Sequence, residues 1–495
     1  MPHSIIINVS TTLYAGRLPG AYRIAHILRQ NNWDVEVLDY FYFWEHSDLQ
    51  EFFKSRITPD TKFIGLSFLF LGWSSQLQSI CTWIKEQYPH IQIISGSASN
   101  LKPSSLTNYR SDSNLIDYHV QGFGENGIIT LLQYLYSNGP RPKFLIGRDK
   151  IIPANTFYPA YPMADLSIIY EDRDYILEDE WLGIEFSRGC KFSCTFCDFP
   201  IIGVKADHTR SSDSFLYQTR DAYDRFGVKN YTVSDETFND STEKITKYAN
   251  AVEELDFVPT FSGFIRADLL VARPQEKEEL LRMNFLGQYY GLETFNHQSG
   301  KSVGKGMDPE KLKQGILDLK KYYLTTNRKV FRATISLILG LPHETVQTLE
   351  HTRQWLVDNW QDQAFYHYVL GIPTGELDIK SKLSTEYSKF KYEEITQSDT
   401  ERYDPAVVKG YYEWEKYTRG SEVLRWKNEN MTVFDAYLVN QEYEKTHKEL
   451  QFKPCNWMLS GLNFNGPIED RVNTLPDDSI AIDKTKNYVN KKLKR

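Results

Sequence analysis

Short apolar runs alternate with amphipathic stretches along this chain, and this alternation is the feature that most restricts its fold. The first helical stretches lie near residues 21–30 and 73–87. The apolar runs around them occupy residues 5–7, 35–38, 63–67, 91–94 and 118–120. Apolar strands that alternate with helices are typical of a parallel sheet covered on both faces. We therefore expect residues 1–137 to form a doubly wound, Rossmann-like α/β domain.

A second alternation begins at residue 183 and ends near residue 375. Strands are expected at residues 183–187, 230–238, 260–268, 286–294, 331–340 and 365–373. Helical patterns between them occupy residues 213–226, 241–255, 274–284, 308–324 and 344–359. When parallel strands of this kind curve into a barrel, the functional site lies at their C-terminal ends. Charged residues or Gly-Pro turns follow strands two to six, so these ends are expected to converge on one site.

The first of these strands leads directly into three closely spaced cysteines. Cys190, Cys194 and Cys197 follow the run Gly183–Phe186 with the spacing C-x3-C-x2-C. Thiolates this close in sequence can converge on one soft metal centre, whereas three cysteines cannot all pair as disulfides. An iron–sulfur cluster usually takes four thiolates, so three would leave one iron open for another ligand.

This motif resembles that of the radical S-adenosylmethionine (radical SAM) superfamily, in which SAM chelates the fourth iron. The six strands then match that superfamily's partial (β/α)6 barrel, over residues 183–375. The resemblance assigns a [4Fe–4S] cluster to the three cysteines and places Phe196 near the SAM adenine. Ser234-Asp235-Glu236 stands at the family's Gly-Gly-Glu position, where the two carboxylates would accept hydrogen bonds from the methionine ammonium.

Further SAM contacts follow from the same resemblance. Arg266 would reach the methionine carboxylate or the ribose, and Glu293 the ribose hydroxyls. Gly340 lies in a turn that resembles the family's G-L-P-G-E-T, with His343 in place of the second glycine. Without this resemblance, Asp235 could simply cap a helix and Arg266 could form a salt bridge within the barrel.

The chemistry implied by the family is reductive cleavage of SAM to methionine and a 5′-deoxyadenosyl radical, which abstracts hydrogen from an unactivated carbon. This needs a one-electron donor such as flavodoxin or ferredoxin. The cofactor supplies the reactivity, and the protein positions the carbon and excludes water.

The N-terminal domain resembles the cobalamin-binding domains that are fused to some radical SAM enzymes. Ser67-Phe68-Leu69 matches their S-x-L, and Gly96-Ser97 matches the later glycine pair. Gly122-Phe123-Gly124-Glu125 matches the G-x-G-E turn at the end of such domains. The D-x-H-x-x-G motif is missing, because Leu13 stands where the cobalt-ligating histidine would fall.

Two interpretations of this domain stay open. If it binds cobalamin, the resemblance implies methyl transfer, with methylcobalamin as donor and SAM recharging it. Small residues at strand ends are also what any doubly wound sheet needs in order to turn. An empty or repurposed module would go with another radical reaction, such as a rearrangement or cyclisation.

Composition limits the remaining possibilities. The net charge of −8 argues against a dedicated nucleic-acid binder. The absence of eighteen consecutive apolar residues and of a signal-like N-terminus predicts neither a membrane span nor secretion. Few cysteines, mostly clustered, favour a reducing cytoplasm.

The rest of the chain gives weaker signals. Residues 138–182 are expected to be an irregular connector, and residues 376–495 a mainly helical region with a solvated, flexible basic tail at residues 484–495. Cys455 is isolated and is expected to be an inert buried residue. A third hypothesis is a structural zinc site, in which the three cysteines are joined by His208 or Cys455.

Overall fold

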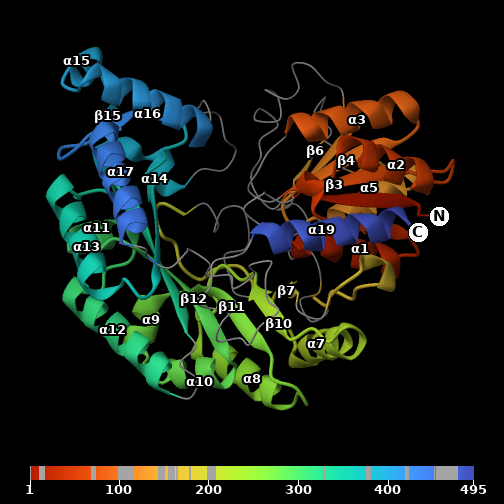
Figure 1. The fold of residues 1–495 in the computed structure, drawn as a ribbon, viewed down its shortest axis with the longest axis horizontal. Helices are drawn as coiled ribbons and strands as arrows, with labels where there is room; N and C mark the ends of the chain where they lie inside the picture. Colours follow the sequence, from red (N-terminus) through yellow and green to blue (C-terminus); the bar gives the residue numbers. More distant parts are fainter. Residues whose placement is uncertain are drawn as a thin grey trace.

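The computed structural model contains two parallel sheets, each covered by helices (Figure 1). It describes residues 2–9, 17–68, 74–97, 115–142, 151–153, 162, 166–177, 180–197, 208–326, 331–374, 381–418, 423–450, 452 and 478–494. Helices cover both sheets, so the predicted α/β class is confirmed.

The N-terminal sheet has six parallel strands in the order β2-β1-β3-β4-β5-β6. Helices α1 and α5 pack on the face that carries Ile6, while α2 and α3 pack on the face that carries Ile5 and Ile7. Its strands are β1 (Ser4–Val9), β2 (Val35–Leu38), β3 (Phe63–Phe68), β4 (Gln92–Ser97), β5 (Tyr118–Gln121) and β6 (Ile151–Pro153). Its helices are α1 (Pro19–Gln30), α2 (His46–Arg56), α3 (Ser75–Gln87) and α5 (Glu125–Tyr136).

Two of these elements, β6 and α2, were not predicted from the sequence. Strand β6 pairs with β5 although it lies in the segment expected to be an irregular connector. Helix α2 was not expected from the pattern, yet its residues Leu49, Phe52 and Phe53 are fully buried. Both faces of every central strand are covered, which is why these strands are apolar throughout rather than alternating.

The second sheet also has six parallel strands, in the order β14-β13-β12-β11-β10-β7. No ladder joins β14 to β7 among the described residues, so the barrel is partial. The strands are β7 (Trp181–Ile184), β10 (Asn230–Val233), β11 (Thr260–Ile265), β12 (Phe285–Glu293), β13 (Arg332–Leu339) and β14 (Ala364–Val369). The outer helices are α7 (Ser212–Phe226), α8 (Thr242–Glu253), α9 (Ala267–Ala272), α10 (Glu276–Arg282), α12 (Pro309–Thr325) and α13 (Val346–Asn359).

A short two-stranded ladder and a short helix lie near the cysteines, outside this sheet. Residues Ser187–Arg188 form β8, which pairs with β9 (His208–Thr209) in an antiparallel ladder. Helix α11 (His297–Val303) follows β12 and was not expected from the sequence pattern. It brings Gly304 against the backbone of Cys194 and therefore belongs to the surroundings of the cysteine loop.

The C-terminal region begins on the barrel side and ends on the N-terminal domain (Figure 1). Helices α14 (Lys382–Thr385), α15 (Gln397–Thr400), α16 (Pro405–Thr418) and α17 (Val433–Glu449) accompany the short ladder of β15 (Glu393–Glu394) with β16 (Trp426–Lys427). Helix α17 lies against β14, where His367 Nδ1 is 3.0 Å from Asn440 Oδ1.

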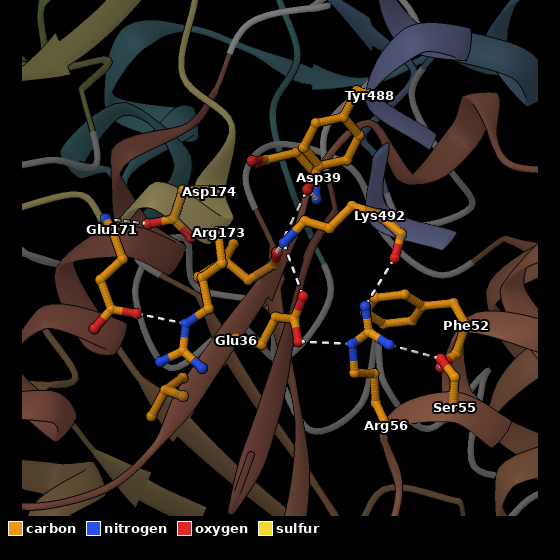
Figure 2. Close-up of polar contacts among 12 residues, drawn as sticks. Glu36, Asp39, Phe52, Ser55, Arg56, Glu171, Arg173, Asp174, Tyr488 and Lys492 are labelled. Atoms are coloured by element: carbon orange, nitrogen blue, oxygen red, sulfur yellow. Dashed lines mark hydrogen bonds and ion pairs between the residues drawn. The ribbon is translucent and has the colours of Figure 1, made fainter. Parts of the chain in front are cut away.

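The expectation of a solvated basic tail was wrong for the described part of that segment. Residues Asp478–Leu493 form helix α19, which packs against α2 of the N-terminal domain. Figure 2 shows Lys492 pointing at Glu36, with Nζ 3.0 Å from a carboxylate oxygen of Glu36. Tyr488 accepts a hydrogen bond from the backbone N–H of Asp39. A sequence pattern could not reveal this, because the partners are more than 400 residues apart.

No helix in the described part of the chain is both long enough and apolar enough to cross a membrane.

Candidate active site

The three cysteines lie in the loop after β8, at the C-terminal end of the barrel. All three are half-buried, and none of the described cysteines forms a disulfide. Gly189 precedes Cys190 with a φ of +96°, a conformation that favours glycine. Thr195 fixes the loop from both sides, because its N–H donates to Val303 and its carbonyl accepts from the N–H of Leu383.

The chemistry of this loop suits an iron–sulfur cluster. Burial raises the pKa of the Cys194 thiol, while the nearby cations Lys305 and Arg266 act in the opposite direction. Cations close to thiols favour the thiolate, which is the form that binds metal.

The geometry gives no support to a single zinc ion. Within the described residues, no three His, Cys, Asp or Glu side chains are placed to hold one metal ion. Such an ion needs ligands about 2.0–2.3 Å from one point, whereas cluster thiolates bind separate irons. His208 lies in β9 beside Arg188. Cys455, the other ligand of the zinc hypothesis, is outside the described residues.

Asp235 and Glu236 follow β10, and the structure gives the two carboxylates different surroundings. Asp235 is buried and accepts hydrogen bonds from the Phe186 N–H at 2.8 Å and the Ser187 hydroxyl at 2.6 Å. Lys244 Nζ lies 3.7 Å from it. Burial raises the pKa of Asp235 to about 6, against the effect of Lys244. Its oxygens are thus engaged in holding the strand that leads to the cysteines.

Glu236 is half-buried, and its buried Oε2 has no hydrogen-bond partner. Burial raises the pKa of Glu236 to about 8, and the nearby Asp235 adds to this effect. An unpaired carboxylate oxygen held away from water is costly, and a cationic ligand would relieve that cost. Of the two predicted ammonium acceptors, Glu236 is the one with a free oxygen.

Arg266 follows β11 and reaches the cysteine loop. Its guanidinium lies 4.0 Å from the ring centroid of Phe192, within that loop. Two of its nitrogens donate to Asp268, at 2.5 and 3.1 Å. The third, Nη1, is buried without a partner. Like Glu236, it therefore offers an unused polar atom, here a donor suited to a carboxylate or hydroxyl.

Glu293 ends β12 in a strained conformation, with a φ of +69°. The ladder with β13 is irregular between Gly291 and Glu293. Lys305 Nζ lies 2.8 Å from Glu293 Oε1, and it also lies 5.8 Å from the ring centroid of Phe196. Non-glycine residues in this region cost about 1–3 kcal/mol and cluster at functional sites. Lys305, which was not predicted as a site residue, thus lies between Glu293 and Phe196, which were.

The turn after β13 adopts backbone conformations that are unusual for its sequence. Gly340 has a φ of +97°, and a Cβ at this position would overlap the ring of Trp426. His343 has a φ of +67°, so the residue in the second glycine position does take the left-handed conformation. The buried Glu344 holds the turn by accepting from the N–H groups of Gly340 and Leu341 and from the Thr294 hydroxyl.

At the N-terminal domain, two of the three predicted cobalamin contacts are described. Ser67 and Gly96 are register partners at the C-terminal ends of β3 and β4. Gly20, at the start of α1, packs closely on Ser67, since a Cβ on Gly20 would lie 3.4 Å from Ser67 Oγ. Leu69 lies outside the described residues, as does Leu13 in the loop after β1. Two adjacent strand ends therefore carry small residues, one of which, Ser67, packs against helix α1.

Sequence reasoning missed several residues near the cysteines. Lys305 lies after the unexpected helix α11, and Lys244 lies on α8, where a lysine reads as an ordinary surface residue. Lys244 is buried, donating to Ser187 Oγ at 2.9 Å and pairing with Asp240 at 2.7 Å. A lysine facing inward on an amphipathic helix was the available signal.

Comparison with known proteins defines the class of the second domain. Residues 184–356 match the radical SAM superfamily, and this range contains all three cysteines and strands β10 to β13. The protein therefore carries a radical SAM domain and is an enzyme. This domain implies a [4Fe–4S] cluster and SAM as cofactors, which the orphaned Glu236 Oε2 and Arg266 Nη1 beside the cysteine loop fit.

Two solved structures share the fold of the whole chain. One is TsrM from Kitasatospora setae, a radical SAM methyltransferase, with cobalamin and a [4Fe–4S] cluster bound. It has a TM-score of 0.63 and 13% identity, covering 98% of this chain and 100% of that one. The other is OxsB, a cobalamin-dependent SAM radical enzyme, with a TM-score of 0.55 and 15% identity over 99% of this chain and 67% of that one. The predicted combination of a B12-binding-type domain with a partial radical SAM barrel is confirmed as the fold.

Sequence relatives cover less. A putative methylthiotransferase of Methanocaldococcus jannaschii is 27% identical over 201 residues, which are 39% of this chain and 43% of the relative. An uncharacterized methyltransferase of Pyrococcus horikoshii is 24% identical over 169 residues, or 34% of each chain. The match thus spans less than half the length of either curated relative.

Proposed function

We propose that this protein is a cobalamin-dependent radical SAM methyltransferase that acts on an unactivated carbon. The unpartnered buried oxygen of Glu236, beside a three-cysteine loop, is the observation that carries the SAM part of the proposal. Cys190, Cys194 and Cys197 would hold the [4Fe–4S] cluster. With three thiolates, one iron stays available to the amino and carboxylate groups of SAM.

The residues around the loop divide the recognition of SAM between them. Glu236 would accept hydrogen bonds from the N–H groups of the methionine amino group, and the free Nη1 of Arg266 would donate to the methionine carboxylate or to the ribose. Asp235 would contribute indirectly, without contacting SAM, because it holds Phe186 and Ser187 in place ahead of the first cysteine. Glu293, oriented by Lys305, would bind the ribose hydroxyls, and Phe196 would pack on the adenine.

When bound and reduced by a one-electron donor, the cluster supplies the electron that breaks a carbon–sulfur bond of SAM. The side chains have the other tasks, which are to orient SAM and the accepting carbon and to keep water away. A flavodoxin or ferredoxin in the cytoplasm would be a suitable electron donor.

The cobalamin part of the proposal rests on different support. The two solved structures described above share this fold and carry cobalamin, and the small residues Ser67 and Gly96 lie side by side at two adjacent strand ends. Backbone atoms and small side chains would make these contacts. The histidine of the cobalamin motif is replaced by Leu13, so we propose binding without a protein ligand to cobalt from that position.

Anaerobic reconstitution with iron and sulfide tests the SAM part. The protein should gain the broad visible absorbance of an iron–sulfur cluster and, with dithionite and SAM, should release 5′-deoxyadenosine or S-adenosylhomocysteine. Stoichiometric zinc with no cluster would contradict the proposal. Incubation with hydroxocobalamin tests the second part, and a protein that retains no corrin would be a radical SAM enzyme of another reaction type.

A further inference from the structure

An ion-pair cluster joins the two domains next to the cysteine loop. Arg188 in β8 lies two residues before Cys190, and Glu125 begins α5 at the far end of the G-x-G-E turn. Arg188 Nη2 lies 2.5 Å from Glu125 Oε1. Both residues are buried, with exposed fractions of 6% and 1%. Neither has a role in binding the cluster or SAM as described above.

Each partner is held by a second residue of its own domain. Arg188 donates to both carboxylate oxygens of Glu185, at 2.5 and 3.0 Å, and Glu125 Oε1 lies 3.4 Å from Nε of Arg23. The Arg188 guanidinium also lies 4.3 Å from the ring centroid of Phe123, in the same turn as Glu125. Two cations and two anions thus alternate across the domain boundary. Loss of one member would leave a buried charge without compensation.

This cluster fixes the strand that delivers the first cysteine. Within the barrel, Asp235 holds Phe186 and Ser187, and across the boundary Glu125 holds Arg188. Only Gly189 separates this doubly anchored segment from Cys190. A change in the position of the N-terminal domain would therefore reach Cys190 through a segment with little freedom to absorb it.

We propose that Glu125 and Arg188 are positioning residues that set the N-terminal domain against the cysteine loop. A reaction step between a ligand of the N-terminal domain and a ligand of the barrel, such as methyl transfer from SAM to cobalamin, then depends on this pair. Cleavage of SAM within the barrel depends on it far less. A displacement of about 1 Å between reacting groups can cost about a hundredfold in rate. This inference rests on the proposed function for its catalytic consequence, but its structural part is independent of that function.

Glu125→Gln tests the pair in the full-length protein, because it removes the charge, keeps the shape and changes no residue of the cysteine loop. Glu36→Gln is the matched control, since Glu36 is equally buried in the same domain between Arg56 and Lys492 (Figure 2). Without cofactors, amide hydrogen exchange should rise at least fivefold over residues 186–190 in Glu125→Gln and stay unchanged there in Glu36→Gln. Equal exchange in the two variants would overturn the proposal.

The catalytic consequence is measured without knowing the final substrate. The reconstituted protein is given SAM, hydroxocobalamin and titanium(III) citrate. S-Adenosylhomocysteine forms when the methyl–sulfur bond of SAM breaks and the methyl group passes to cobalt that the titanium has reduced. 5′-Deoxyadenosine reports SAM cleavage in the barrel alone. The ratio of the first product to the second should fall at least fivefold in Glu125→Gln and stay constant in Glu36→Gln.

The possible failures are separable. If the wild type makes no S-adenosylhomocysteine, the cobalamin proposal fails and hydrogen exchange decides on the pair by itself. If both products fall equally in Glu125→Gln, the pair has only a general structural role and the inference is wrong. Should Glu125→Gln not fold, Arg188→Lys keeps the charge but loses the two-pronged contact with Glu185. It should show the same changes at smaller amplitude, and wild-type exchange and ratio in it would overturn the inference.

Discussion

The two sheets differ at the C-terminal ends of their strands, where the ligands are proposed to bind. At the barrel, charged side chains meet at the cysteine loop, and two of them, Glu236 and Arg266, keep a buried polar atom unused. At the N-terminal sheet, the ends of β3 and β4 carry the small residues Ser67 and Gly96. Buried charges of that domain are paired, for example Asp39 after β2 with Arg17, and Glu36 beneath helix α19 with Arg56 and Lys492 (Figure 2).

This difference indicates two modes of recognition. A site made of charged side chains with unused atoms is prepared for a small ionic ligand, and single substitutions there should have large effects. A site made of backbone and small side chains fits a large ligand through many weak contacts. Substitutions there should act by adding bulk, and each effect should be modest.

The largest effect is expected at the cysteine loop. Cys194→Ala should abolish the visible absorbance of the reconstituted cluster and reduce release of 5′-deoxyadenosine by more than a hundredfold, because one iron loses its thiolate. Absorbance spectroscopy and product analysis measure this. Cys81→Ala is the control, since Cys81 is buried within the N-terminal core and should leave both readouts unchanged. A normal cluster in the Cys194→Ala protein would show that Cys194 is not a ligand, and the barrel would then not have the cluster site on which the comparison depends.

The adjacent carboxylates should separate binding from folding. Glu236→Gln should weaken SAM binding by about ten- to a hundredfold, because a hydrogen bond to a charged group contributes about 1.5–3 kcal/mol. Its melting temperature should stay about the same below pH 8, where the Glu236 carboxyl group is largely uncharged, and should rise above that pH, where glutamine removes a buried charge. Asp235→Asn should instead lower the melting temperature, because Asp235 holds Phe186 and Ser187.

Isothermal titration and thermal denaturation measure the two quantities, with the exposed Glu254→Gln as control. If Asp235→Asn lost SAM affinity at unchanged stability while Glu236→Gln lost stability, the roles assigned to the two carboxylates would be exchanged.

SAM affinity should depend on pH in a way that identifies Glu236. Burial raises the pKa of Glu236 to about 8, so the carboxyl group is largely uncharged below that pH. Affinity should rise by roughly tenfold between about pH 6.5 and 8.5 as the Glu236 carboxylate forms, while the α-amino group of SAM, whose pKa is about 8, loses a proton over the same range. The same shift contributes stability to the ligand-free protein at low pH, and this contribution is lost as the pH rises through about 8. In Glu236→Gln the part of this rise that comes from the carboxylate should disappear, so the pH profile should be flatter. A profile identical to that of the wild type would assign the whole rise to another group, such as the amino group of SAM.

The smallest effect is expected at the N-terminal domain. A Cβ on Gly96 would lie at an ordinary contact distance of 3.5 Å from the Val120 carbonyl, so Gly96→Ala should fold normally. Added bulk at this strand end should weaken corrin binding about three- to tenfold, measured by retention of hydroxocobalamin. Gly371→Ala, where a Cβ would meet open space in the barrel, is the control. Loss of all corrin binding in Gly96→Ala would mean that this domain, too, relies on single strong contacts.

The sequence predicts the fold and the strand ends well, because both depend on periodic patterns that are local in the chain. The positions of Cys190, Glu236 and Arg266 after their strands follow from such patterns. The engagement of Asp235 does not, because its partners Phe186 and Ser187 lie 49 and 48 residues away. Lys305 was missed since helix α11 is too short to give a periodic signal.

The C-terminal helix shows the same limit. A run of lysines reads as a solvated tail, yet Lys492 is fully buried against Glu36 and the backbone of Val37. Lys492 is buried only because the fold brings residues 36 and 492 together, and the sequence pattern near Lys492 holds no sign of that contact. His343 is a further case, because its left-handed backbone is imposed by the surrounding turn rather than by its own preference.

Electron paramagnetic resonance of the reduced cluster, recorded with and without SAM, tests the central claim most directly. The claim is that three cysteines leave one iron open and that Glu236 and Arg266 hold SAM beside it. SAM should change the g-values of the wild-type cluster, and in Glu236→Gln this change should require at least tenfold more SAM. A cluster signal that SAM does not alter at any concentration would contradict the account.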